Sequence, residues 1–232
     1  MQRIKKFFNR LFAFLILFAV AASFSQSANA KLYRKSTAET KKIALTFDDG
    51  PSRQNTEEIL GILKEYKIRA TFFVIGENAE KDPERIRMIY DAGHEIGNHT
   101  YSHAYITKIP KEALREEVKK TEKILKDITG ERPIVFRPPG GFYNDETLDI
   151  LEEMGYVSIL WSLDTKDWSM PKSDTVASKV EEDATGGDII LFHDLEDKRL
   201  PTPQALRRII PYLIENGYEF VTISEMMENE AD

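Results

Sequence analysis

Short apolar runs alternate with amphipathic segments along most of this chain, and no other sequence feature restricts its fold as strongly. Apolar runs that read as strands lie at 43–47, 70–75, 134–136, 157–163, 188–192 and 219–223, and a further short segment, 95–98, leads into a histidine. Apolar residues recur at helical spacing between these runs, which predicts helices at 56–66, 83–91, 111–129, 145–154, 175–183 and 203–216.

This order gives about seven strand–helix units and no hairpin signal. Such alternation implies parallel strands joined by crossover helices. Nearly continuous apolar strands fit a sheet that is covered on both faces. We therefore predict one α/β domain with a closed or nearly closed barrel, and a doubly wound open sheet is the alternative.

The N-terminus has the three parts of a secretory signal. Met1 to Arg10 carries four basic residues and no acid, Leu11 to Ala22 is apolar, and Ala28-Asn29-Ala30 forms an A-x-A cleavage site. The twelve-residue apolar run is shorter than the roughly 20 residues that span a bilayer. We expect a signal peptide at 1–30, a polar, mobile lead-in at 31–40 and a folded domain at 41–228. The chain is then secreted or associated with the cell envelope; an uncleaved segment would be a membrane anchor.

Cysteine is absent from the 232 residues. This excludes disulfides, zinc–thiolate sites, iron–sulfur clusters and cysteine nucleophiles. Any metal must bind His, Asp or Glu, and the chain has only four His. Removal of the four basic residues of the signal changes the net charge from −7 to −11, so we expect no nucleic-acid partner, because phosphates need a basic surface.

Unusual polar residues follow five different predicted strands. In parallel α/β folds, active sites form at the carboxyl ends of the strands. Packing alone hardly explains so many acids, imidazoles and guanidinium groups at one rim. The residues concerned are Asp48, Asp49, His99, Arg137, Asp164, Asp167 and His193.

A metal site is predicted from two of these segments. His99 and His103 are four residues apart, so on one helical turn both imidazoles reach one ion. Asp48 and Asp49 are adjacent, so one acid can bind the metal while the other faces the reacting water. Two His and one carboxylate leave positions open, as in catalytic zinc sites, although the same set serves non-haem iron. The alternatives are a helix start with two half-exposed His and a plain Asp-Asp-Gly-Pro turn.

The remaining rim residues predict acid–base chemistry. Arg137 precedes a Pro-Pro-Gly-Gly loop and would orient Asp48, unless it forms a surface salt bridge. The N–H of Gly140 could donate to an oxyanion. His193 becomes a general acid if Asp164 or Asp167 is its partner. We further expect Trp168 to line a pocket or pack in the core, His94 to be structural, and Glu116 and Glu117 to be solvated.

Five segments in this order resemble the ordered motifs of the polysaccharide deacetylases, the NodB-homology carbohydrate esterases. The resemblance covers about 41–227, nearly all of the expected mature chain. The segments are Thr46-Phe-Asp-Asp-Gly50, His99-Thr-Tyr-Ser-His103, Arg137-Pro-Pro-Gly-Gly141, Asp164-Thr-Lys-Asp-Trp168 and Leu191-Phe-His193.

The resemblance implies a distorted (β/α)₇ barrel and metal-dependent removal of acetyl groups from sugars. Asp48 would be the base, with Arg137 paired to it. Asp49, His99 and His103 would bind the metal, usually zinc, and His193 would be the acid, tuned by Asp167. Leu191 and Trp168 would line the acetyl pocket. Gly140 stands where the family often has Tyr, so any contact of that side chain is missing.

We expect a glycan substrate, first peptidoglycan N-acetylglucosamine, then chitin oligomers or acetylated xylan. Nothing in the residues distinguishes an amide from an ester. Two hypotheses of other classes are a glycan-binding barrel without catalysis and an iron oxygenase. The five intact motifs argue against the first, and the strand–helix repeat argues against the second, whose usual scaffold is a β jelly roll.

Overall fold

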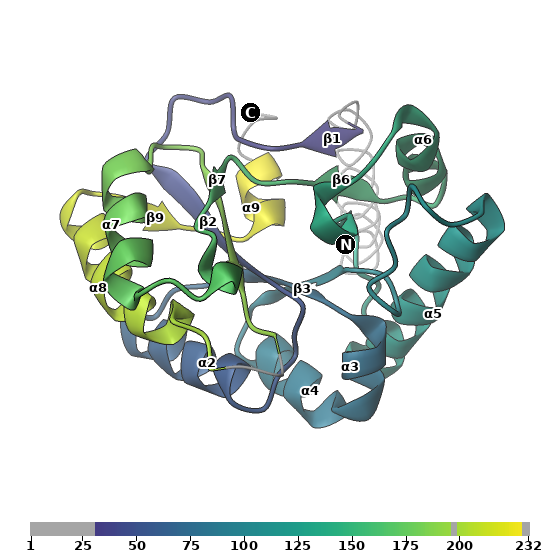
Figure 1. Ribbon diagram of the computed structural model, residues 1–232, viewed down its shortest axis with the longest axis horizontal. Coiled ribbons are helices and arrows are strands. Elements are labelled where there is room, and N and C mark those ends of the chain that lie inside the picture. The colour runs from purple at the N-terminus through teal and green to yellow at the C-terminus, as the bar shows by residue number, and fades with distance from the viewer. Residues whose placement is uncertain (1–30, 196–198, 229–232) are drawn as a thin grey trace, which may run out of the picture. The chain divides into compact units, whose positions relative to one another are not determined.

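A curved sheet of parallel strands forms the centre of the protein (Figure 1). The computed structural model describes residues 31–195 and 199–228, and the predicted signal peptide at 1–30 lies outside them. In space, the strands follow the order β1-β6-β5-β4-β3-β2-β8-β7, and β9 pairs with β2. The strands are β1 (Leu32–Tyr33), β2 (Lys42–Asp48), β3 (Thr71–Val74), β4 (Glu95–Asn98), β5 (Val135–Phe136), β6 (Val157–Ile159), β7 (Leu163–Asp164), β8 (Ile189–His193) and β9 (Glu219–Phe220).

Helices surround the sheet, with α7 and α8 on one side and α5 on the other (Figure 1). Local signals set their bounds: Asp82 accepts a hydrogen bond from the N–H of Arg85 at the start of α4, and Gly130, at φ 83°, ends α5. The helices are α2 (Asn55–Tyr66), α3 (Gly76–Lys81), α4 (Pro83–Asp91), α5 (Lys111–Thr129), α6 (Asp145–Glu153), α7 (Ser173–Asp183), α8 (Thr202–Glu215) and α9 (Ile223–Glu228), with 3₁₀ turns η2 (Pro139–Gly141) and η3 (Asp167–Ser169).

Alternation along β2 divides its side chains between the two faces of the sheet. Leu45 and Phe47 join the larger core beneath the helices, where Phe47 stacks on Phe72 at 4.9 Å between ring centroids. Full burial of one such side chain stabilises the fold by about 1.5–3 kcal/mol. Ala44 packs in a smaller core on the concave face. Thr46 and Asp48 are two and four residues after Ala44 and so lie on the same face of the strand. Strand β2 therefore directs the Asp48 carboxylate to the concave face, at the carboxyl end of the strand.

The predicted barrel-like α/β domain is confirmed, as a sheet curled into a half-barrel between edge strands β1 and β7. The expected strand at 157–163 is divided into β6 and β7. The expected mobile lead-in contains β1, which pairs with β6. Helices α3 and α9 were not predicted from the sequence. Among the described residues, no helix is both long and apolar enough to cross a membrane.

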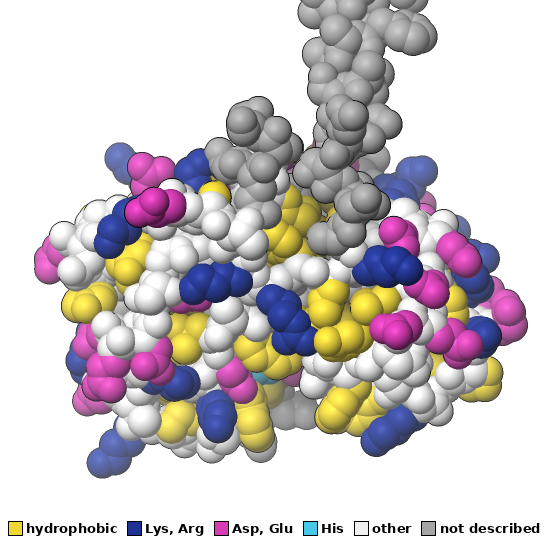
Figure 2. All heavy atoms as spheres, turned by 90° about the horizontal axis from the view of Figure 1, so that it is seen from above, with side chains coloured by type: hydrophobic (Ala, Val, Ile, Leu, Met, Phe, Trp, Pro, Cys, Tyr) yellow, Lys and Arg dark blue, Asp and Glu magenta, His cyan; other side chains and the backbone are white. Residues whose placement is uncertain are grey.

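Basic and acidic side chains are interspersed over the face shown in Figure 2, and hydrophobic side chains lie between them. Several ion pairs of opposite sign connect neighbouring elements, such as Lys31–Asp149 and Arg115–Glu153. Solvent screens exposed pairs of this kind, so they contribute little to stability. The fold therefore depends mainly on its apolar cores.

Candidate metal centre and active site

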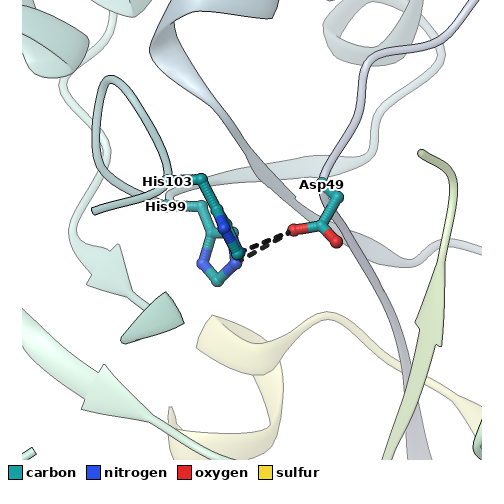
Figure 3. Close-up of side chains that lie close together, drawn as sticks. All are labelled: Asp49, His99 and His103. Carbon is teal, nitrogen blue, oxygen red and sulfur yellow. Dashed lines mark ion pairs between the residues drawn. The ribbon is translucent and has the colours of Figure 1, made fainter. Parts of the chain in front are cut away.

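Asp49 and the two histidines form the one group of three or more potential ligands found among the described residues. The Oδ1 atom of Asp49 lies 3.3 Å from Nε2 of His99 and 3.2 Å from Nε2 of His103. In Figure 3 both imidazoles point toward the Asp49 carboxylate. Three ligand atoms from two loops thus converge on one point.

The electrostatics of this group suit a cation. Burial raises the pKa of Asp49, but hydrogen bonds from His103 and His99 outweigh it and hold that pKa below its usual range. The hydrogen bond to Asp49 and its charge raise the pKa of His103, although burial opposes them. The group therefore combines a carboxylate that stays ionised with a His103 imidazole that favours its positively charged form.

The His99–His103 segment corrects one prediction. The two residues lie in a loop after β4 and not on a helical turn, and Thr100 and His103 have φ values of 65° and 58°. The loop is held by groups outside it. The Oδ1 of Asn98 accepts from the N–H of Thr100 at 3.0 Å.

Glu117 on α5 is the second residue that holds this loop. We predicted a solvated side chain at this position, which is wrong. One oxygen, Oε2, accepts from the N–H groups of Tyr101 and Ser102 at 2.8 and 2.7 Å. The other, Oε1, accepts from the Ser102 hydroxyl at 2.9 Å. The Glu117 carboxylate thus satisfies backbone N–H groups that would otherwise need partners within a helix. The loop can therefore place His99 and His103 together without forming a helix.

The residues present fit a divalent metal. Asp49 Oδ1 is buried and faces only the two imidazole nitrogens, with neither of which it forms a hydrogen bond of good geometry. A buried oxygen left in this state is suited to bind a metal ion. Nδ1 of His99 lies 2.7 Å from the carbonyl oxygen of Arg137. That contact favours the tautomer in which Nδ1 donates and Nε2 keeps its lone pair toward the site. Two imidazole nitrogens and one carboxylate oxygen are a donor set of catalytic zinc.

Asp48 lies beside the metal group but has a different partner. Its Oδ1 accepts from Nη1 of Arg137 at 2.7 Å, and its Oδ2 lies 3.9 Å from Nε2 of His99. Arg137 is fully buried and also donates to the Thr46 hydroxyl at 2.8 Å. The buried guanidinium therefore fixes one carboxylate oxygen and leaves the other directed to the metal group.

His193 and Asp167 form a second pair across from Asp48. Asp48 and His193 are opposite each other in the β2–β8 register, so their backbones lie about 5 Å apart. Nδ1 of His193 lies 2.8 Å from Oδ1 of Asp167, and the N–H of His193 donates to Oδ2 at 2.9 Å. The Thr202 hydroxyl also donates to Oδ2. Burial lowers the pKa of His193, but the bond and charge of Asp167, with the charges of Asp48 and Asp49, outweigh it and raise the pKa to about 9.

The other predicted site residues lie around this centre. Leu191 is buried in β8 two residues before His193, on the same face of the strand. Trp168 is 51% exposed, which excludes the alternative of a core residue. Asp164 accepts from the N–H of Lys166 and shapes a turn, so Asp167 and not Asp164 is the partner of His193.

Gly140 lies in η2 with φ 64°, a conformation that favours glycine.

A cavity of about 560 Å³ adjoins the metal group and is lined by Asp49 and His103, among others. Another cavity, of about 540 Å³, includes His94 and Glu95 at the opposite ends of the strands. His94 is buried, and its Nδ1 accepts from the N–H of Ala70. The first cavity, and not the second, thus adjoins the predicted metal ligands.

Sequence reasoning missed Thr202, Glu117 and Thr46, which hold site residues in place. Each acts across many residues of sequence; Thr202 and Asp167, for example, are 35 residues apart. A hydroxyl or carboxylate group on a helix or strand carries no sequence signal of such a contact.

Comparison with known proteins agrees with this geometry. A family model described as polysaccharide deacetylase matches residues 35–159. A peptidoglycan-N-acetylglucosamine deacetylase of Bacillus cereus is 40% identical over 189 residues, which cover 81% of this chain and 88% of that protein. A crystal structure of a peptidoglycan N-acetylglucosamine deacetylase with a bound N-oxidanyl-benzamide compound has a TM-score of 0.84 and 37% identity, covering 88% of this chain and 96% of the other.

A structure described as a CE4 family pseudoenzyme from Bacillus anthracis has a TM-score of 0.79 and 29% identity, and covers 84% of this chain and 68% of the other. The fold is therefore shared by proteins with and without catalysis, and the side chains of the site must distinguish them. With the family model and the relatives in agreement, the chain belongs to the polysaccharide deacetylase family.

Proposed function

We propose that this protein is an exported, zinc-dependent deacetylase that hydrolyses the N-acetyl group of N-acetylglucosamine in peptidoglycan. The reaction consumes one water, breaks the amide C–N bond, and yields acetate and a free amine. The B. cereus relative that carries this name aligns with most of the chain. Export is supported by the signal pattern at 1–30.

One observation carries the proposal. The Asp49–His99–His103 group lies beside the Asp48–Arg137 pair. A cation held by the three ligands supplies Lewis-acid polarisation of the acetyl carbonyl and lowers the pKa of water. The base Asp48 directly precedes the ligand Asp49 in sequence, and its Oδ2 lies 3.9 Å from Nε2 of the ligand His99, so the base and the metal would act at the same point of the substrate.

The chain's own residues perform the proton transfers. Asp48 accepts the proton of the attacking water through the carboxylate oxygen that Arg137 leaves free. His193, kept protonated by Asp167, donates a proton to the leaving nitrogen. The Gly140 N–H donates to the developing oxyanion. Leu191 and Trp168 border the acetyl group.

Acetate release tests the proposal. The zinc-loaded protein is incubated with peptidoglycan, N-acetylglucosamine oligomers and acetylated xylan, with and without a chelator. We expect release from peptidoglycan, loss of release with the chelator, and recovery when zinc is added. Release from xylan alone would assign an esterase, and release from oligomers alone a chitooligosaccharide deacetylase.

Two variants assign the roles. Asp48→Asn should keep its zinc and lose activity by roughly 10²–10⁴-fold, and full turnover in that variant would remove Asp48 from the base role. His103→Ala should lose zinc, which elemental analysis measures. Absence of acetate from every substrate, with zinc bound, would favour the glycan-binding barrel.

The proposed export and domain limits have a separate test. Expression in a bacterium that secretes proteins should yield a mature chain beginning at Lys31, which mass spectrometry of the N-terminus determines. An intact N-terminus in the membrane fraction would instead show an anchor.

A further inference from the structure

Two exposed aromatic rings stand beside the metal group and have no part in the chemistry described above. Tyr105 is 40% exposed and Phe142 is 54% exposed. Their rings pack edge to face, 5.4 Å apart at an interplanar angle of 85°. The Tyr105 ring also lies 6.0 Å from the ring of His103, a predicted metal ligand. We call Tyr105 and Phe142 the aromatic step, because they lead from the metal group to the surface.

The aromatic step occupies the space that a side chain at position 140 would take. A Cβ added to Gly140 would lie 2.9 Å from Cε1 of Tyr105 and 3.0 Å from two carbons of the Phe142 ring. Contacts this short require the rings to move. The absence of a side chain at Gly140 and the positions of the two rings therefore depend on each other. The rings of Tyr105 and Phe142, from two loops, fill the space that a side chain at position 140 would occupy.

The exposure of these rings calls for a ligand that covers them. Large apolar side chains at the mouth of a polar site are typical of binding sites and not of ordinary surface. Nζ of Lys108 lies over the Tyr105 ring, 4.9 Å from its centre, and adds a polar group beside the two rings. The two nearly perpendicular rings form an apolar corner with a polar margin, and the Phe142 ring is the more exposed of the two.

We propose that the aromatic step is a stacking platform for the sugar ring next to the one that is deacetylated. A pyranose ring has an apolar face of C–H groups and a rim of hydroxyls, which matches an exposed ring with a polar margin. The position beside His103 places the bound sugar next to the reacting unit of the same glycan. This inference rests on the proposed deacetylase function, and it adds a preference for chains longer than one sugar.

The platform contacts a sugar at which no bond is broken. Its loss should therefore raise KM and leave kcat nearly unchanged. Removal of the Phe142 ring exposes apolar area of the bound complex, for which we expect about a tenfold decrease in kcat/KM on long substrates. Short substrates that do not reach the step should be unaffected.

The experiment measures acetate release by the zinc-loaded full chain on N-acetylglucosamine oligomers of two to six units. Phe142→Ala is compared with Phe142→Tyr, which keeps the ring, and with Ile214→Ala, which removes another exposed apolar side chain from the far end of α8. We expect Phe142→Ala to lose the preference for long oligomers, and both comparison variants to keep it. Tyr105→Ala should repeat the loss, and melting temperatures verify that each variant is folded.

Two outcomes would overturn the platform while leaving the deacetylase function intact. One is an unchanged length preference in Phe142→Ala; the other is an equal loss on the shortest and the longest oligomer. If the wild type releases acetate from neither the oligomers nor peptidoglycan, the proposed function fails, and calorimetric titration with the hexamer decides the platform separately. Weaker binding by Phe142→Ala supports it, and equal binding by both proteins refutes it.

Discussion

The pH dependence of catalysis should depend on Asp167, because this buried carboxylate controls the protonation of His193. Its two oxygens accept from Nδ1 and from the backbone N–H of His193. Asp167→Asn removes the negative charge but nearly preserves the shape of the side chain. The proton on His193 then loses its main stabilising partner.

The expected size follows from the raised pKa. With Asp167, the pKa of His193 is about 9, against 6.5 for an ordinary histidine. At pH 8, a group with a pKa of 9 is about 90% protonated, whereas one with a pKa of 6.5 is about 3% protonated. If His193 must donate its proton, activity at pH 8 should fall about 30-fold, while activity at pH 5.5 changes far less. Burial lowers the pKa of His193, so the fall can be larger.

The assay is kcat/KM for acetate release between pH 5 and 10 at saturating zinc. In the wild type, the rate should decline on the basic side near pH 9, or somewhat below it, because a bound cation offsets the charges of Asp48 and Asp49. In Asp167→Asn, the decline should move to about pH 6.5 or lower. Thr202→Val is the matched control, since it removes one hydrogen bond to Asp167 and keeps the charge. A basic limb at the same pH in Asp167→Asn and wild type would refute His193 as the general acid.

Three further predictions concern the supports of the site. Gly50→Ala places a Cβ 2.2 Å from a carboxylate oxygen of Asp194. We therefore expect the free energy of unfolding to fall by about 1–3 kcal/mol and Asp49 to bind zinc more weakly. Urea denaturation measures the first effect, and an unchanged midpoint would contradict it. Glu117→Ala should weaken zinc binding about 10- to 100-fold by loosening the histidine loop, as measured by competition with a chromogenic chelator, and equal affinity would show that the loop holds itself. Burial and the neighbouring carboxylates raise the pKa of Asp194 from 3.8 to about 7, against its hydrogen bond from Thr56. The folded chain then binds this proton more tightly than the unfolded chain, so its stabilising contribution is lost between about pH 4 and 7, and Asp194→Asn should reduce the difference in melting temperature between pH 4.5 and pH 8 in the metal-free protein.

The parts of the fold that the sequence predicted best are governed by neighbouring residues. The bounds of α4 and α5 match the predicted 83–91 and 111–129, because a proline at the start and a glycine after the end act locally. The assembly of the rim was also predictable, since parallel strands bring their carboxyl ends to one edge. Asp48 and His193 are 145 positions apart in sequence and yet adjacent in register.

The parts that could not be predicted depend on contacts between distant segments. The histidine loop was predicted as a helical turn because spacing of four residues fits a helix. Glu117 overrides that tendency from another element, by bonding the N–H groups of Tyr101 and Ser102. The aromatic step could not be predicted for the same reason. Tyr105 and Phe142 belong to two loops that meet only in the folded protein.

Backbone conformation explains how the chain positions its metal ligands. Asp49, Thr100 and His103 have φ values of 75°, 65° and 58°, a region that costs a non-glycine residue roughly 1 kcal/mol or more. Protein hydrogen bonds offset this cost: Asn98 and Glu117 hold the histidine loop, and the Asp49 carbonyl accepts from the side chain of Asn78. Because these bonds involve no ligand, the fold itself brings the carboxylate and imidazoles together. A metal then binds to ligands that folding has already ordered, so binding costs little further conformational entropy. A site ordered in advance is suited to catalysis.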